Sequence, residues 1–104
     1  MSEFRFNEDV EILGHIESNG IDDLFVYDRD FQPGDTVRHF KGDFYKIVAI
    51  GTNTETEEKM VVYQSLKDQK VWIRPYDMFI SKVDREKYPN THQPYRLIKV
   101  KITA

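Results

Sequence analysis

From residue 36 onward the chain is a succession of short apolar segments separated by turn signals. Isoleucine and valine together number 18, whereas alanine and leucine together number 6. β-Branched and aromatic residues favour pleated, half-buried strands, while helical bundles and coiled coils need alanine, leucine, glutamate and lysine in helical periods. The pattern therefore predicts an all-β fold and excludes a helical bundle.

The turn signals divide residues 36–104 into strands. Gly42 lies in a tight Lys-Gly-Asp turn, and Pro75 must leave regular pairing because proline has no backbone donor. Residues 76–79 then fit a single helical turn. We expect five strands, over residues 36–40, 44–51, 59–66, 70–74 and 95–102. Short strands with close turns are typical of a small barrel, so residues 36–104 are predicted to form a β-barrel domain.

The first 35 residues differ in charge from the rest. Residues 1–35 hold 10 acids and 2 bases, whereas residues 36–104 hold 8 acids and 13 bases. We interpret the first part as an acidic N-terminal extension, which could lie over the basic face of the barrel as an intramolecular competitor. Within it, apolar residues at helical spacing and Asn7 as a possible N-cap predict a short helix over residues 8–17.

One hairpin of the predicted barrel suggests a binding face. If Asp68 and Gln69 form a two-residue loop, Tyr63 pairs with Arg74. One face then carries Tyr63, Ser65, Trp72 and Arg74, and we assign the other face, with Val62, Gln64, Leu66, Val71 and Ile73, to the core. Two interpretations of Trp72 stay open. It is a structural ring covered by the N-terminal segment, or it lines a groove in which Tyr63, Trp72 and Arg74 contact a ligand.

Most chemical functions leave no signature in the chain. There is no Gly-x-x-x-x-Gly-Lys, no Gly-x-Gly-x-x-Gly, no serine between spaced glycines and no cysteine, so we expect no cofactor and no nucleophile of these kinds. Among the histidines, His39 stands beside Arg38 and Lys41, which would repel a metal cation. The longest apolar runs are far too short for a membrane span, and the acidic start does not resemble a secretory signal. We therefore expect a cytoplasmic protein.

Two functional alternatives deserve weight beside a simple interaction domain. Basic residues interleave with aromatic rings after residue 36, which is how small barrels hold single-stranded nucleic acid. The pI of about 5.6 argues against this, because nucleic-acid-binding domains usually exceed about 9. An enzyme using His39 as an acid or base is the second alternative, although no paired carboxylate or nucleophile is evident.

Three spaced motifs carry a family resemblance. The stretches VRHFKGDFYKI, MVVYQSL and WIRPYDMF, in this order between residues 37 and 79, resemble the bacterial family known as domain of unknown function 1653. The resemblance implies an SH3-like β-barrel and no known activity. The matching positions without an obvious structural explanation are His39, Lys41, Tyr63, Trp72 and Arg74. They form our predicted ligand-binding site.

We expect a non-catalytic binding or accessory module. Its ligand would be an anionic or carboxylate-bearing small molecule, or a peptide, held by Arg74 and Lys41 and stacked on Trp72 and Tyr63. A guanidinium fork suits carboxylate and phosphate geometry, and nearby rings add contact area at low entropic cost.

Overall fold

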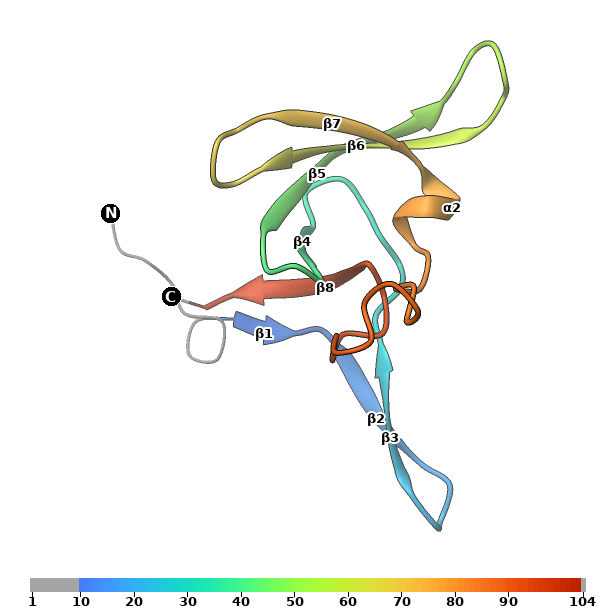
Figure 1. The fold of residues 1–104 in the computed structure, drawn as a ribbon, viewed down its shortest axis with the longest axis vertical. Coiled ribbons are helices and arrows are strands. Elements are labelled where there is room, and N and C mark those ends of the chain that lie inside the picture. Colours follow the sequence, from blue (N-terminus) through green and yellow to red (C-terminus); the bar gives the residue numbers. More distant parts are fainter. Residues whose placement is uncertain (1–9, 104) are drawn as a thin grey trace.

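Two antiparallel sheets make up the fold in the computed structural model, which describes residues 10–103 (Figure 1). The larger sheet has six strands in the order β1-β8-β4-β5-β6-β7. Their bounds are β1 Val10–Ile12, β4 Thr36–His39, β5 Phe44–Thr52, β6 Lys59–Ser65, β7 Val71–Pro75 and β8 Leu97–Ile102. The smaller sheet is a hairpin of β2, Gly14–Ser18, and β3, Asp23–Tyr27. One helical turn, α2, spans Tyr76–Phe79.

The all-β prediction is confirmed, and so are its five strands from residue 36 onward, to within two residues at each end. The predicted helical turn at residues 76–79 is also present. The prediction that Pro75 leaves regular pairing is wrong, because Pro75 is the last residue of β7 and pairs with Met60. Proline is tolerated there because β7 is an edge strand. Gly42 has a φ of 110°, a conformation that glycine adopts without strain, and it closes the turn between β4 and β5. The backbone N–H of His39 donates to Asp43 O at 2.8 Å across this turn. Local turn chemistry therefore fixes the strand boundaries in this part of the chain.

The larger sheet is open. Within the described residues β1 and β7 each pair on one side only, with β8 and β6 respectively, so the strands do not close into a complete barrel. A sixth strand, β1, extends the sheet beyond the five that we expected. In the described part of the chain no helix has the length and apolar character needed to cross a membrane.

The predicted helix over residues 8–17 is wrong where the structure describes it, since β1 and β2 occupy residues 10–18. Its first two residues, and Asn7, lie outside the described part. Ile12 pairs with Val100 of β8, and the Leu13 N–H donates to Lys99 O at 3.0 Å. Pairing with a neighbouring strand outweighs an apolar spacing that was only locally helical, and Gly14 weakens a helix further.

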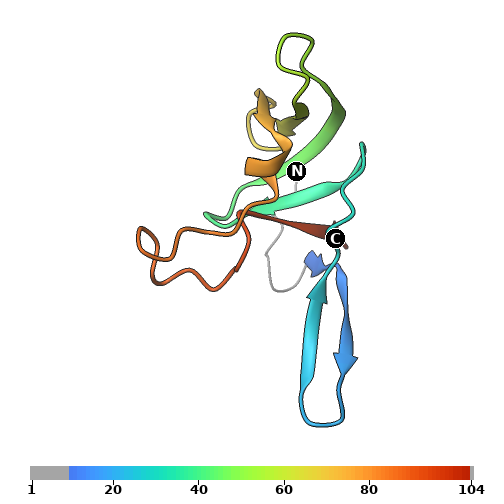
Figure 2. The same ribbon diagram turned by 90° about the vertical axis from the view of Figure 1, so that its right-hand side faces the viewer.

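The segment predicted as an extension contributes to the core. Phe31 is buried and its ring lies edge-on against Phe79, with centroids 5.5 Å apart. Lys99 of β8 forms ion pairs with Asp28 at 3.3 Å and Asp35 at 3.2 Å, which ties the same segment to the sheet. By contrast, the β2–β3 hairpin projects away from the larger sheet, as both views show (Figure 2).

The register of the β6–β7 hairpin differs from our prediction. Tyr63 pairs with Trp72, and Arg74 pairs with Val61. The reason is the turn, because the Ser65 N–H donates to Lys70 O at 2.9 Å and so leaves four loop residues between them instead of two. Gln69 has a φ of 62° at the end of this loop. The predicted pairing of Tyr63 with Arg74 is therefore wrong.

The two faces of this hairpin were correctly separated but wrongly assigned. Tyr63, Ser65, Trp72 and Arg74 do share one face, because a shift of register by two residues preserves the alternation. That face, with buried Val61, Tyr63 and Ser65, looks onto the core, whereas Ile73 on the opposite face is 67% exposed. The core cluster consists of Phe31, Val37, Ile47, Val61, Tyr63, Phe79 and Leu97.

Candidate functional site

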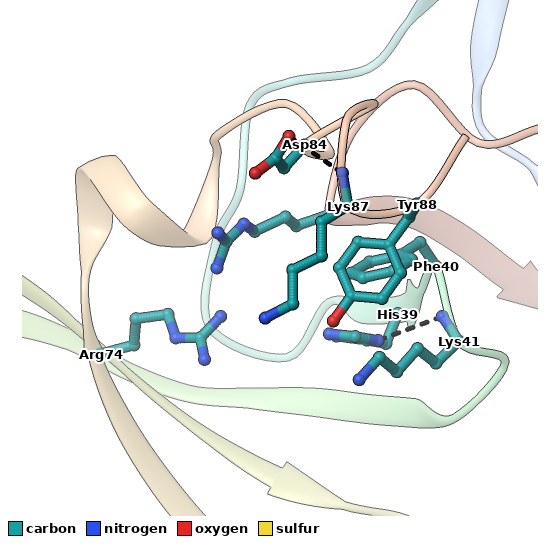
Figure 3. A pocket seen from close by; sticks show the side chains of 8 residues that line it. His39, Phe40, Lys41, Arg74, Asp84, Lys87 and Tyr88 are labelled. Atoms are coloured by element: carbon teal, nitrogen blue, oxygen red, sulfur yellow. Dashed lines mark hydrogen bonds between the residues drawn. The ribbon is translucent and has the colours of Figure 1, made fainter. Parts of the chain in front are cut away.

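A pocket of about 310 Å³ lies between the β4–β5 turn, the end of β7 and the loop that precedes β8 (Figure 3). Three of the five predicted site residues line it, namely His39, Lys41 and Arg74. The full lining is His39, Phe40, Lys41, Arg74, Asp84, Lys87, Tyr88 and Arg96. The structure thus brings residues that are 35 positions apart in sequence to one cavity.

A buried glutamine holds the loop before β8 in place. The Gln93 amide nitrogen donates to Arg38 O at 3.0 Å, to Tyr95 O at 2.8 Å and to Arg96 O at 3.3 Å. Its Oε1 accepts from Arg38 Nη1 at 2.9 Å. In addition, the Phe40 N–H donates to Arg96 O at 2.9 Å. These bonds attach the C-terminal end of the loop to β4 and to Phe40, the residue that follows β4.

Asp84 shapes the part of the loop that faces the pocket. Its Oδ1 accepts from the backbone N–H groups of Glu86 at 3.0 Å and Lys87 at 3.4 Å, and its carbonyl accepts from the Tyr88 N–H at 2.9 Å. A short aspartate side chain that bonds to the backbone ahead of it is a common way to start a turn. The turn presents the Lys87 and Tyr88 side chains to the cavity (Figure 3).

Aromatic rings form one wall of the pocket. The Tyr88 ring lies edge-on against Phe40, with centroids 4.9 Å apart, and Phe40 stacks on His39 at 4.5 Å. Lys41 Nζ is 5.2 Å from the Tyr88 ring centroid, and Lys87 Nζ is 5.6 Å from it. A side-chain hydrogen bond from Lys41 lowers the pKa of the Tyr88 hydroxyl. The wall therefore combines stacked rings with cations.

The charge of the lining is strongly positive. Four cations (Lys41, Arg74, Lys87 and Arg96) surround the cavity together with one carboxylate, that of Asp84. In the described part of the chain, none of the four lies within 4.0 Å of a carboxylate oxygen. Four cations with a single carboxylate leave an excess of positive charge, and the cations repel one another. An anion bound between them would relieve this repulsion.

His39 is neutral at physiological pH. Burial, and then the positive charges of Arg74 and Lys41, lower its pKa from 6.5 to about 4. Its Nδ1 accepts the backbone N–H of Lys41 at 3.1 Å, so in the neutral ring the proton sits on Nε2. His39 thus offers the pocket a neutral N–H donor.

Tyr63 and Trp72, the other two predicted site residues, do not line this pocket. Tyr63 is 7% exposed and packs edge-on against Tyr45 and Phe79, both at 5.3 Å between centroids. Trp72 is 44% exposed, with Lys70 Nζ 4.4 Å from its ring centroid. Tyr63 is therefore a core residue, and Trp72 is an open ring on the surface of β7.

The predicted acidic competitor does not occupy the pocket as far as the structure describes it. None of residues 10–35 contributes to its lining, and residues 1–9 lie outside the described part.

Sequence reasoning missed five of the eight lining residues, namely Phe40, Asp84, Lys87, Tyr88 and Arg96. Lys87 and Tyr88 were missed because residues 85–94 read as a polar connection. A usable signal was present, since the adjacent Lys87 and Tyr88 repeat the basic–aromatic pairing seen in the strands. Nothing in the sequence indicates how the loop folds back.

A metal site is not formed by the part of the chain that the structure covers, where no cluster of three or more histidine or acidic side chains could hold an ion. The cations around His39 make that position unsuitable as a ligand for a metal.

Comparison with known proteins confirms the resemblance carried by the three motifs. A profile of the family described as "Protein of unknown function (DUF1653)" matches residues 35–97, which is more than half of the chain. The match covers β4 to the start of β8, including every residue that lines the pocket. Neither the curated proteins nor the solved structures give a significant match.

Proposed function

This chain belongs to the DUF1653 family of proteins of unknown function, and we propose that it is a non-catalytic binding module for an anion that carries a carboxylate or phosphate group. The observation that carries the proposal is the cluster of four cations without carboxylate partners around a half-enclosed pocket. Like charges at close range are unfavourable, so an anion bound among these four side chains would stabilise the arrangement.

Four of the lining residues have groups that suit an anionic ligand. Arg74 would form the forked, two-point contact that suits a carboxylate or phosphate, since its guanidinium presents parallel donors. Lys41 and Lys87 would add point charges from opposite sides of the cavity (Figure 3). The Tyr88 ring would supply an apolar surface for the rest of the ligand. In this proposal Tyr88, instead of Trp72 and Tyr63, supplies the aromatic ring that contacts the ligand.

Single-stranded nucleic acid is a second candidate ligand. The observation that favours it is the placement of Trp72 on the same face of β7 as Arg74, with Lys70 against the exposed indole. A phosphate in the pocket and a base on Trp72 would use both features, as in other single-strand binding surfaces.

Catalysis by His39 has less support. A general base works best when its pKa lies near the working pH, and that of His39 is lowered to about 4. In addition, the unprotonated ring nitrogen, Nδ1, already accepts a hydrogen bond from the Lys41 backbone N–H.

We also infer that the fold is a variant of the SH3-like barrel. Support comes from the five-strand order β8-β4-β5-β6-β7 and from the helical turn α2 that precedes the last strand.

A titration monitored by backbone NMR tests the proposal. The probes are inorganic phosphate, succinate and a ten-residue oligothymidylate, each added to the full chain. We expect phosphate or succinate to shift the amide signals of Phe40, Lys41 and Tyr88, and Lys87→Gln to weaken that response. Lys46→Gln, at an exposed lysine on β5 outside the pocket, is the matched control.

The two candidates separate by salt and by location. Oligothymidylate binding should weaken steeply as salt rises and should also shift the Trp72 indole signal. If none of the three probes shifts pocket signals at millimolar concentration and low salt, the proposed function is wrong.

A further inference from the structure

Four strands pair on one side only among the described residues, namely β1 and β7 of the larger sheet and β2 and β3 of the hairpin. Of these, β7 and β3 carry the most exposed large apolar side chains. β7 is the last strand of the larger sheet, and β3 belongs to a two-stranded sheet, so among the described residues each pairs on one side only. An open edge offers N–H and C=O groups that a further strand can use. Natural proteins usually protect edges that carry exposed apolar side chains, so the edges of β7 and β3 call for an explanation.

β7 combines its open edge with exposed apolar side chains. Val71, Trp72 and Ile73 are all exposed, Ile73 most of all. Lys70 O faces β6, where it accepts the Ser65 N–H at 2.9 Å. Because antiparallel strands alternate, the backbone groups of Val71 and Ile73 point away from β6, toward the open edge. This edge is therefore ready to accept another strand.

β3 also combines an open edge with exposed apolar side chains. Its central residues Leu24, Phe25 and Val26 are apolar, and Leu24 is 65% exposed. The Asp28 N–H donates to Leu13 O at 3.0 Å, so by alternation the backbone groups of Phe25 and Tyr27 point to the open side. An isolated two-stranded hairpin is marginally stable in water, and this one projects into solvent (Figure 2). It would gain stability from a third strand.

The charges of the two strands are complementary. β7 is bounded by Lys70 and Arg74, whereas β3 is bounded by Asp22 and Asp23 at one end and by Asp28 at the other. Antiparallel pairing of the two strands places Arg74 opposite Asp22 in one register and Lys70 opposite Asp28 in the next. Opposite charges across strands stabilise a sheet, and like charges destabilise it.

Pairing of β7 with a second β7 lacks this advantage. The register that uses both outward residues pairs Val71 of one copy with Ile73 of the other. That register also sets Lys70 directly opposite Arg74, two positive charges, at both ends of the contact. The charges thus favour β3 over β7 as the strand that joins β7.

The two edges lie at opposite ends of the molecule, as both ribbon views show, so β3 cannot reach β7 of its own chain (Figures 1 and 2). We propose that β3 of one copy adds to the β7 edge of a second copy. Two copies arranged head to tail would make this contact twice, once at each end, and would form a closed two-fold dimer.

Sedimentation analysis of the full chain over micromolar to millimolar concentrations tests the dimer. Ile73→Lys breaks the β7 side and Leu24→Lys breaks the β3 side, and each should raise the dimer dissociation constant by at least about tenfold. Val48→Lys, an exposed apolar residue in the interior strand β5, is the matched control and should leave association unchanged. Far-ultraviolet circular dichroism checks that each variant is folded.

Mixing the two variants gives the decisive result. In a mixture of Ile73→Lys and Leu24→Lys, the intact β3 of the first can still join the intact β7 of the second, so heterodimers should form where each variant alone is monomeric. A β7–β7 dimer would not be restored by mixing. A wild-type chain that stays monomeric throughout, or a Leu24→Lys variant that associates as the wild type does, overturns the proposal.

Discussion

Replacing Arg74 by glutamine tests the pocket at its most informative position. Arg74 lies at the end of β7, is half-buried, and has no carboxylate within 4.0 Å among the described residues. Glutamine keeps much of the length of the side chain and removes its charge. Two independent properties should change, namely the affinity for an anion and the pKa of His39.

The loss of affinity follows from the kind of contact. A hydrogen bond to a charged group contributes about 1.5–3 kcal/mol, and partial exposure of the pocket favours the lower part of this range. A loss of about 1.5–2 kcal/mol corresponds to roughly 10- to 30-fold weaker phosphate or succinate binding. Lys46→Gln removes one positive charge outside the pocket, and it should change affinity by less than about threefold at moderate salt.

The pKa of His39 supplies the second readout. The positive charge of Arg74 is the second-largest cause of its lowered value, after burial. Removing that charge should therefore raise the pKa of His39 above about 4, while burial keeps it below 6.5. NMR titration of the imidazole C–H signals measures this directly. If Arg74→Gln leaves both anion affinity and the His39 pKa unchanged, then Arg74 does not face this pocket and the proposed site is incorrect.

Further predictions concern stability. Gly14→Ala would place a Cβ 2.3 Å from Val26 O, so it should open the β2–β3 hairpin, seen as faster amide exchange there with little change in the larger sheet. Gln93→Leu removes donors from three backbone carbonyls and should lower the free energy of unfolding in urea by about 2–4 kcal/mol, with weaker anion binding because the pocket loop loosens. His39 takes up a proton at higher pH when unfolded than when folded, so stability should fall between about pH 6.5 and 4, by at most about 3 kcal/mol, and His39→Asn should remove that fall.

The fold after residue 36 could be predicted because its determinants are local. Gly42 acts through its own backbone geometry, and β-branched segments between turns favour strands. Pro75 did not end the pairing as predicted, because it lies on an edge strand and pairs with Met60. The β6–β7 turn shows the limit of this reasoning. A loop of two residues and a loop of four both fit the sequence around Asp68, and hydrogen bonding of Ser65 to Lys70 selects the longer one.

Non-local contacts explain the failures. Residues 10–12 form a strand because they pair with β8, which lies more than 80 residues later in the sequence. Residues 14–18 form a strand because they pair with β3, which the prediction of a helix did not consider. The position of the pocket loop depends on Gln93, whose partners are backbone carbonyls on β4 and around the start of β8. A buried amide with several backbone partners has no signature in sequence beyond a single polar residue. The sequence indicated the cations Lys41 and Arg74, but not Lys87 and Arg96, which the loop before β8 contributes.

The motif aromatics connect the pocket to the core. The His39 ring lies 6.4 Å from Tyr45, which lies 5.3 Å from Tyr63, which lies 5.3 Å from Phe79 at the centre of the core. Edge-on contacts of this kind stabilise beyond the area they bury. Because Lys41 bonds to His39 through its backbone N–H, the β4–β5 turn that carries one pocket cation rests on this row of rings. Tyr63 therefore supports the site indirectly, because it packs against Tyr45, whose ring lies beside His39 in the pocket wall. Its place in the motif requires no contact with a ligand.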